Sequence, residues 1–169
     1  MNKISLEEIK PKDLYRIYQI TSNPEVMKYV GNGKPWTKEN VYNFIKYNLI
    51  EKKQNNSKRT HYSYKIVYNN DLAGIIEFHQ FNELKNKNYH NKYFITRFID
   101  IKYQRKGLGY LSMQLIKKEF YIHKSQSDKL YSLVRKSNEP MKKFMNKYNY
   151  QIKDEIIFNN ETFLIYEIN

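Results

Sequence analysis

The run Gln104-Arg105-Lys106-Gly107-Leu108-Gly109 has the residue types of an anion-binding turn. It holds two of the five glycines in the chain, with two cationic side chains beside them. Glycine has no Cβ, so a ligand can approach the backbone, and the first N–H groups of a helix point toward an anion. The apolar periodicity predicts a helix that begins near Leu108. The sequence therefore predicts a phosphate cradle here; the alternative is a turn that only joins a strand to a helix.

A few side chains could also take part in proton transfer. Glu77 is the only carboxylate inside a predicted central strand, and strand alternation places it on the same side as Ile75 and His79. In a cleft Glu77 could accept a proton directly or through water, and the alternative is an exposed strand residue. His79 is a second candidate. Tyr131 could reach the site from a neighbouring strand, or it could pack in the core.

Composition and spacing argue against several other functions. The chain has no cysteine, and its histidines at 61, 79, 90 and 123 lack the spacing of metal ligands, so no metal site is predicted. No apolar run approaches the roughly 18 residues of a membrane span, and residues 1–8 lack the apolar core of a signal peptide. A cytoplasmic protein without a membrane contact is expected, since the absence of cysteine suits a reducing compartment.

The net charge of +13 raises the question of nucleic-acid binding. The lysines are scattered, as in Lys52-Lys53, Lys117-Lys118 and Lys142-Lys143, and no nucleic-acid-binding module is visible. A basic footprint for nucleic acid should cluster on one face and interleave with stacking aromatics. A nucleic-acid partner is therefore not favoured, while the positive charge would attract a small anionic ligand.

The elements that must position these residues follow one another without a linker, which predicts a single domain over residues 1–169. Helices are expected after Pro11, after the N-cap Thr37, over 108–120 and after Asn138. Strands are expected at 3–9, 62–68, 72–81, 92–101, 129–135, 152–158 and 162–168. The order β-α-α-β-β-β-α-β-α-β-β predicts an α/β fold with a mostly antiparallel sheet of about seven strands and about four helices.

With this element order the chain resembles the GCN5-related N-acetyltransferase (GNAT) superfamily from end to end, and the segment from Ile99 to Gly109 resembles its acetyl-CoA signature. The resemblance implies that the backbone of Ile99 and Ile101 pairs with the pantetheine arm of acetyl-CoA. Asn138 matches a family asparagine that contacts the same arm. The residues expected to wrap the diphosphate are Gln104, Arg105, Lys106, Gly107, Leu108, Gly109 and Tyr110.

The resemblance implies an enzyme that moves acetyl from acetyl-CoA to a primary amine, and residues 23–29 with the helix after Thr37 are similar to the branch that acetylates ribosomal-protein N-termini and polyamines. The chain also departs from the family at positions expected to transfer protons. Met145 occupies the place of a tyrosine that protonates the departing thiolate in many members, and the usual places of a glutamate base hold Tyr93, Phe94 and Leu133.

An enzyme without a strong base suits an amine of low pKa, such as a peptide N-terminus near pKa 8 or an amino sugar, rather than a polyamine amine near about 10.4. A catalytically weak or inactive acetyl-CoA sensor of the same fold is the alternative function. The chain is expected to be a monomer or a homodimer.

Overall fold

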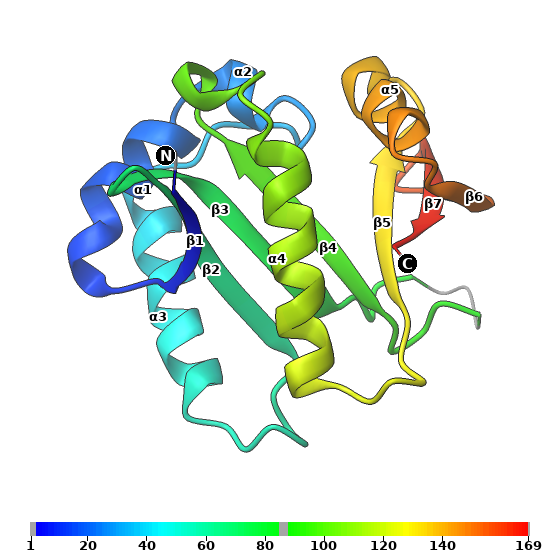
Figure 1. The fold of residues 1–169 in the computed structure, drawn as a ribbon, viewed down its shortest axis with the longest axis horizontal. Helices are drawn as coiled ribbons and strands as arrows, with labels where there is room; N and C mark the ends of the chain where they lie inside the picture. Colours follow the sequence, from blue (N-terminus) through cyan, green and yellow to red (C-terminus); the bar gives the residue numbers. More distant parts are fainter. Residues whose placement is uncertain (1–2, 85–87, 169) are drawn as a thin grey trace.

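The computed structural model describes residues 3–84 and 88–168, which form one seven-stranded sheet with helices on both faces (Figure 1). The strand order is β1-β2-β3-β4-β5-β7-β6. The strands are β1 (Ile4–Glu8), β2 (His61–Tyr68), β3 (Asp71–Gln80), β4 (Tyr93–Ile99), β5 (Leu130–Arg135), β6 (Gln151–Phe158) and β7 (Glu161–Glu167). The helices are α1 (Leu14–Thr21), α2 (Pro24–Met27), α3 (Lys38–Lys52), α4 (Leu108–His123) and α5 (Glu139–Lys147).

The predicted fold class and element order are confirmed. The short helix α2 is the one addition to the expected helices, and the 3-10 turn Pro11–Asp13 precedes α1. Residues 85–87, between β3 and β4, lie outside the described residues, as do residues 1, 2 and 169.

Local chemistry explains where the main elements begin and turn. Thr37 caps α3 by accepting the N–H of Asn40 at 3.1 Å, while the side-chain oxygen of Asn40 accepts the N–H of Thr37 at 2.9 Å. Asn69 and Asn70 join β2 to β3 with φ values of 50° and 67°. Two successive positive φ angles match the twist of a two-residue hairpin, and asparagine tolerates them better than most residues.

The two faces of the sheet carry different helices. The larger apolar cluster packs α4 and α5 against one face and includes the fully buried residues Phe78, Ile116 and Met145. A second cluster packs α1, α2 and α3 against the opposite face, around Ile17 and Ile75. Together the two clusters fix the β4 strand between helices that come from distant parts of the chain.

β4 and β5 form the only parallel pair in the described sheet, and they pair over three residues. The pairs are Tyr93 with Leu130, Phe94 with Tyr131, and Ile95 with Ser132. Beyond Ile95 the two strands diverge, and Figure 1 shows the gap between their carboxyl ends. The backbone of β4 beyond Ile95 is therefore unpaired on the β5 side, an edge that an extended ligand can pair with.

The expectation of a strand that continues to residue 101 is wrong at its end. β4 stops at Ile99, and Ile101–Tyr103 form a 3-10 turn. Asp100 begins this turn, since its side chain accepts the N–H of Lys102 at 3.2 Å. A carboxylate that bonds to the backbone two residues later favours a turn over a strand.

Candidate active site

The glycine turn between β4 and α4 leaves its backbone open to a ligand. Gly107 is the N-cap of α4 and has a φ of +79°, and a Cβ added there would meet no atom within 4 Å. In the described part of the chain, the N–H groups of residues 105–109 donate to no backbone carbonyl. Arg105 also has a positive φ, 61°, which is costly for a residue with a Cβ. Free donors at a helix N-terminus give this turn the geometry expected of an anion cradle.

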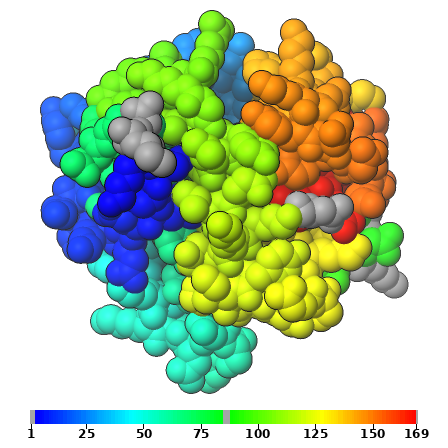
Figure 2. Space-filling model, in the orientation of Figure 1, coloured from blue at the N-terminus to red at the C-terminus, as the bar shows by residue number. Residues whose placement is uncertain are grey.

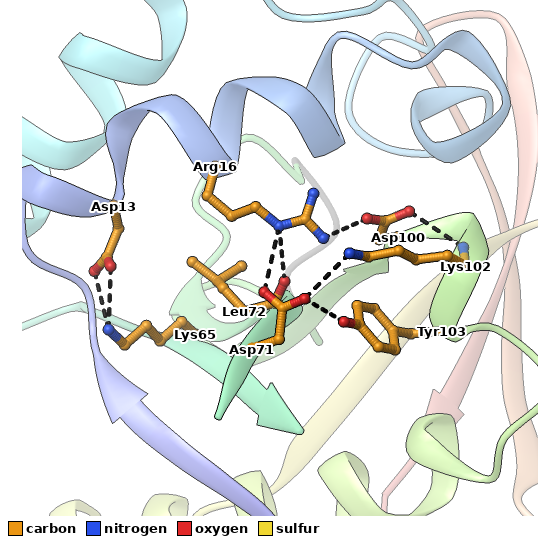
Figure 3. Close-up of polar contacts among 8 residues, drawn as sticks. All are labelled: Asp13, Arg16, Lys65, Asp71, Leu72, Asp100, Lys102 and Tyr103. Carbon is orange, nitrogen blue, oxygen red and sulfur yellow. Dashed lines mark hydrogen bonds and ion pairs between the residues drawn. The ribbon is translucent and has the colours of Figure 1, made fainter. Parts of the chain in front are cut away.

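Helix α1 holds the start of this turn through a network of charges (Figure 3). Arg16 donates to the carbonyl of Leu72 at 3.1 Å and forms an ion pair with Asp100. Arg16 also lies 3.8 Å from Asp71, which accepts hydrogen bonds from the Lys102 ammonium and from the Tyr103 hydroxyl. The Tyr103 hydroxyl and then the Lys102 ammonium hold the pKa of Asp71 below its ordinary value, so its negative charge is retained.

The other residues expected to bind the cofactor lie on both sides of the gap between β4 and β5. The carbonyl of Ile99 accepts from the Gln104 side chain at 2.9 Å, and the carbonyl of Ile101 accepts the Gln104 N–H at 3.1 Å. Ile101 is half-exposed. Across the gap, Asn138 caps α5 by accepting the N–H of Met141 at 3.1 Å, which leaves its amide Nδ2 for another partner.

The first turn of α4 is anchored from within. Leu108 is buried in the larger apolar cluster, and Gly109 allows close packing, because a Cβ there would lie 3.3 Å from the Phe144 ring. Tyr110 stacks on Tyr148 with ring centroids 4.2 Å apart, which links the first turn of α4 to the end of α5. Figure 2 shows a notch between the green atoms at the start of α4 and the orange atoms of α5, with blue atoms of the N-terminal part behind it.

Glu77 is buried, with 9% of its surface exposed, so the alternative of an exposed strand residue is wrong. Its Oε2 atom lies 2.9 Å from both the Ser63 hydroxyl and the His61 Nε2 atom, and Oε1 lies 3.9 Å from His79 Nδ1. Burial opposes the ionised carboxylate, but the His61 charge and hydrogen bond, with His79 and Ser63, lower the pKa of Glu77 to about 2. Glu77 is therefore a weak base that orients its neighbours.

His61 and His79 stack with ring centroids 5.2 Å apart. Burial disfavours the charged form of both rings, yet Glu77 raises the pKa of His61 above its ordinary value, while the pKa of His79 is lowered. The sequence did not predict Ser63 or His61 as partners of Glu77. Counting back from the Asn69-Asn70 turn would place Glu77 opposite Tyr62, but a bulge between Ile66 and Val67 shifts the register by one residue.

Tyr131 lies on the same face of the sheet as Glu77. Glu77 pairs with Thr96 on β4, and Phe94, two residues before Thr96, points to the same face. Tyr131 pairs with Phe94 and therefore shares this face. Tyr131 is buried against Phe94 and Tyr89, with ring centroids 5.7 Å and 5.4 Å away, and burial raises its pKa. In the described part of the chain no hydrogen bond joins Tyr131 to Glu77. The two candidate catalytic residues thus share a face without direct contact.

Met145 is fully buried in the larger apolar cluster, so it offers neither a proton nor an exposed surface. A cation lies near the same helix. Arg97, on β4, donates to the carbonyl of Gly109, and its guanidinium lies 4.8 Å from the centroid of Phe144. Arg97 was not among the residues predicted from the sequence, because its position two residues beyond the last β4–β5 pair depends on the strand pairing.

The segment between α2 and α3 contacts the end of β5 at the open side of the gap. The Arg135 guanidinium donates to the carbonyls of Lys28 and Gly31 at 3.2 Å and 2.9 Å, and its Nε atom lies 2.6 Å from Glu161. A Cβ on Gly33 would lie 3.0 Å from the Lys28 carbonyl oxygen. Residues 28–33 therefore form a strap, held by Arg135, on the face of the sheet that carries Glu77.

Among residues 3–84 and 88–168, no three His, Cys, Asp or Glu side chains are grouped so that they could hold a metal ion. No helix in that part of the chain combines the length and the apolarity needed to cross a bilayer.

Comparisons with known proteins bear on the family and fold of the chain. The family model described as "Acetyltransferase (GNAT) domain" matches residues 3–151. A GNAT-family acetyltransferase from Bacillus anthracis has 22% identity and a TM-score of 0.74, with 98% of this chain and 93% of that chain covered. The aminoglycoside acetyltransferase AAC(6')-Ib, solved with coenzyme A, has 12% identity and a TM-score of 0.76, with 98% and 94% covered.

A Salmonella typhimurium acetyltransferase that modifies the N-terminal serine of ribosomal protein L7/L12 has 13% identity and a TM-score of 0.76, with 97% of this chain and 93% of that chain covered. At these identities the solved structures show a shared fold. A search by sequence among curated proteins gives no significant match. The family model spans most of the chain, from β1 to the start of β6, and includes the glycine turn. The chain therefore belongs to the GNAT acetyltransferase family and is an acyltransferase.

Proposed function

We propose that the chain, acting as one domain, transfers acetyl from acetyl-CoA to a primary amine of low pKa, such as a peptide N-terminus or an amino sugar. The observation that carries this proposal is the gap between β4 and β5 beside a helix N-terminus with free N–H groups. Acetyl-CoA supplies an acetyl group activated as a thioester. The extended arm and the anionic diphosphate of that molecule suit the unpaired strand edge and the anion cradle, respectively.

The proposed contacts follow from the positions of the residues. The N–H groups of residues 105–109, with the charges of Arg105 and Lys106, would hold the diphosphate. The unpaired edge of β4 near Ile99 would pair with the pantetheine arm, and Asn138 Nδ2 would donate to it from the other side of the gap. These contacts would place the thioester near the point where β4 and β5 separate, next to Thr96 and thus one strand away from Glu77.

The groups near that point support an amine that is already partly neutral. The pKa of Glu77 is about 2, and the pKa of His79 is below its ordinary value, so neither is a strong base. The pKa of His61 is raised, but its Nε2 atom is already engaged with the Glu77 carboxylate at 2.9 Å. An α-amino group with a pKa near 8 is about one-tenth neutral at neutral pH, while an alkyl amine near 10.4 is neutral to less than about one part in a thousand. A weak base is sufficient to deprotonate the α-amino group but deprotonates the alkyl amine poorly.

The test is release of free CoA thiol from acetyl-CoA, followed with a thiol reagent across peptide N-termini, amino sugars and polyamines. The protein has no cysteine, so it adds no background to this assay. We expect turnover with a peptide or an amino sugar. Robust turnover of polyamines, without activity on the other two classes, would contradict the proposed acceptor.

Binding is measured separately by thermal unfolding. At a concentration of one hundred times its dissociation constant, acetyl-CoA should add about 2.7 kcal/mol to the free energy of unfolding. Stabilisation without turnover on any amine would favour a sensor, for which buried Met145 in place of a proton donor is the supporting observation. Absence of stabilisation would overturn both functions.

A further inference from the structure

Arg97 is a cation held between the two helices that flank the gap. It lies on β4, two residues beyond Ile95, where pairing with β5 ends. Its guanidinium donates to the carbonyl of Gly109 in the first turn of α4. On the α5 side, the guanidinium carbon lies 4.8 Å from the Phe144 centroid, and one terminal nitrogen lies 3.8 Å from the Met141 sulfur. These contacts aim the charge into the space between α4 and α5.

No carboxylate among residues 3–84 and 88–168 pairs with this guanidinium. Burial lowers the pKa of Arg97 to about 10, opposed by the nearby Tyr150 phenol, so the side chain remains protonated at neutral pH. A buried charge without an opposite charge is costly. Arg97 as a whole residue is of intermediate burial, so it is not fully enclosed by the protein. Arg97 therefore has the environment of an ion pair whose negative partner would come from a bound ligand.

Two anionic groups of the proposed donor could complete the pair: the diphosphate, or the thiolate that forms when the acetyl group leaves. The free N–H groups of residues 105–109 are already available to bind the diphosphate. Arg97 instead donates to a backbone carbonyl, that of Gly109, and adds no further N–H group to that set. Arg97 touches α5 at Met141 and Phe144, the turn that carries Met145. The resemblance to the acetyltransferase family implies a proton donor for the thiolate on that turn, and Met145 cannot donate a proton.

We propose that Arg97 is a catalytic residue that stabilises the CoA thiolate as the acetyl group is transferred; this inference rests on the proposed function. The amine nitrogen forms a bond to the acetyl carbon, the carbon–sulfur bond breaks, and its electron pair remains on sulfur. The amine nitrogen loses its extra proton to water. Arg97 keeps its protons and supplies a positive charge and hydrogen bonds to the sulfur, which a fixed donor can do without reorganisation.

The first test is the affinity for free CoA and for acetyl-CoA between about pH 6 and about pH 9, a range that includes a thiol pKa near 8.5 and in which Arg97 stays charged. A positive charge lowers the pKa of a nearby thiol, so bound CoA should ionise at lower pH than free CoA. The affinity of the wild-type protein for CoA should then rise with pH relative to that for acetyl-CoA, which has no free thiol. Tyr150 is a titratable side chain near Arg97, and burial raises the pKa of Tyr150. The Tyr150→Phe variant shows whether Tyr150 contributes to the pH dependence.

The variants are Arg97→Gln, which removes the charge, and Arg97→Lys, which retains it. Arg59→Gln is the matched control. Like Arg97, Arg59 packs on an aromatic ring, 4.0 Å from the centroid of Tyr62, and donates to a backbone carbonyl, at 3.0 Å. Unlike Arg97, it lies at the start of β2, where β2 is paired with β3, and away from the gap between β4 and β5. We expect Arg97→Gln to abolish the pH-dependent gain in CoA affinity, to leave acetyl-CoA affinity within about twofold and to lower kcat by about a hundredfold. Arg97→Lys should retain part of the pH-dependent gain in CoA affinity and part of kcat. Arg59→Gln should change neither quantity.

Desulfo-CoA, which lacks the sulfur, separates the two anions and can be tested on the wild-type protein without any substitution. If Arg97 faces the sulfur, desulfo-CoA binds without the rise in affinity at high pH. Equal losses of affinity for acetyl-CoA, CoA and desulfo-CoA in Arg97→Gln would make Arg97 a diphosphate anchor and overturn the proposal. An unchanged pH dependence and kcat in that variant would also overturn it. Failure of the wild-type protein to bind or use acetyl-CoA would instead contradict the proposed function itself.

Discussion

Glu77 is a buried carboxylate whose ionised form is stabilised by neighbours from another strand. Its pKa is about 2 in the folded protein, below the ordinary value of 4.5. Such a group contributes stability that is fully present above the unfolded pKa and is lost as pH falls through the folded pKa. His61 has the opposite sign, because its pKa is raised: its contribution is present below its ordinary pKa and is lost as pH rises through the folded value.

The substitution Glu77→Gln tests this balance. We expect it to lower the free energy of unfolding near neutral pH by about 2 kcal/mol, because it removes hydrogen bonds made to a charged group. The difference from the wild-type protein should shrink between about pH 5 and about pH 2, where the wild-type carboxylate becomes protonated. Urea unfolding across this range measures the effect.

The control for Glu77→Gln is Glu39→Gln, at an exposed carboxylate in the first turn of α3. It should change stability by less than about 0.5 kcal/mol. A difference between Glu77→Gln and the wild-type protein that stays constant down to about pH 2 would show that the Glu77 carboxylate is not held ionised.

At the scale of elements, the turn between β4 and α4 joins local geometry to binding. Gly107 and Gly31 both have positive φ values, 79° and 53°, and a Cβ at either position would meet no atom within 4 Å. Gly107 begins α4 at the proposed diphosphate site, while Gly31 lies in the strap of residues 28–33. The two glycines thus both need a positive φ angle, but only Gly107 lies at the proposed diphosphate site.

The substitutions Gly107→Ala and Gly31→Ala separate backbone strain from binding. Each should lower the free energy of unfolding by about 1 kcal/mol, the cost of a left-handed conformation for a residue with a Cβ. Gly107→Ala should also weaken acetyl-CoA binding, since its methyl group would lie where the diphosphate approaches the backbone. Calorimetric titration with acetyl-CoA measures this, and equal affinities in the two variants would contradict a diphosphate site at Gly107.

At the scale of the whole molecule, the two halves of the sheet are tied together at the open end of the gap. β4 and β5 pair over only three residues, so the sheet has few backbone bonds at its centre. Arg135 on β5 compensates by holding the N-terminal strap, and the Tyr29 hydroxyl lies 3.5 Å from the carbonyl of Ser137. The same contacts place the strap beside the face on which Glu77 lies, where an acceptor would approach.

The substitution Arg135→Gln should release this strap. Loss of hydrogen bonds from a charged donor should speed hydrogen exchange in residues 28–33 by about tenfold. The KM for the amine acceptor should rise, while acetyl-CoA affinity stays within about twofold of the wild-type value. Glu161→Gln is the control, because it removes the 2.6 Å ion pair of Arg135 and keeps its bonds to the strap. Equal exchange rates in Arg135→Gln and the wild-type protein would contradict a strap held by Arg135.

The sequence by itself determined the features that depend on neighbouring residues. Thr37 caps its helix as predicted, and Asn138 caps the helix that was expected to follow it. Asn69-Asn70 joins two expected strands, and Gly107 begins the predicted helix. Each of these follows from one residue's backbone preference or from a hydrogen bond that spans about three residues. The element order, and with it the resemblance to the acetyltransferase family, rests on the same short-range signals together with apolar periodicity.

Only the tertiary structure decided which distant side chains meet. The bulge between Ile66 and Val67 determines that Glu77 pairs with Ser63 and lies near His61. In a register shifted by one residue, Glu77 would pair with Tyr62, whose side chain points to the other face of the sheet. The divergence of β4 from β5 exposes a strand edge and leaves Arg97 between two helices that are more than fifteen residues apart in the chain. Register, burial and charge pairing depend on contacts between remote segments, and no local preference encodes them.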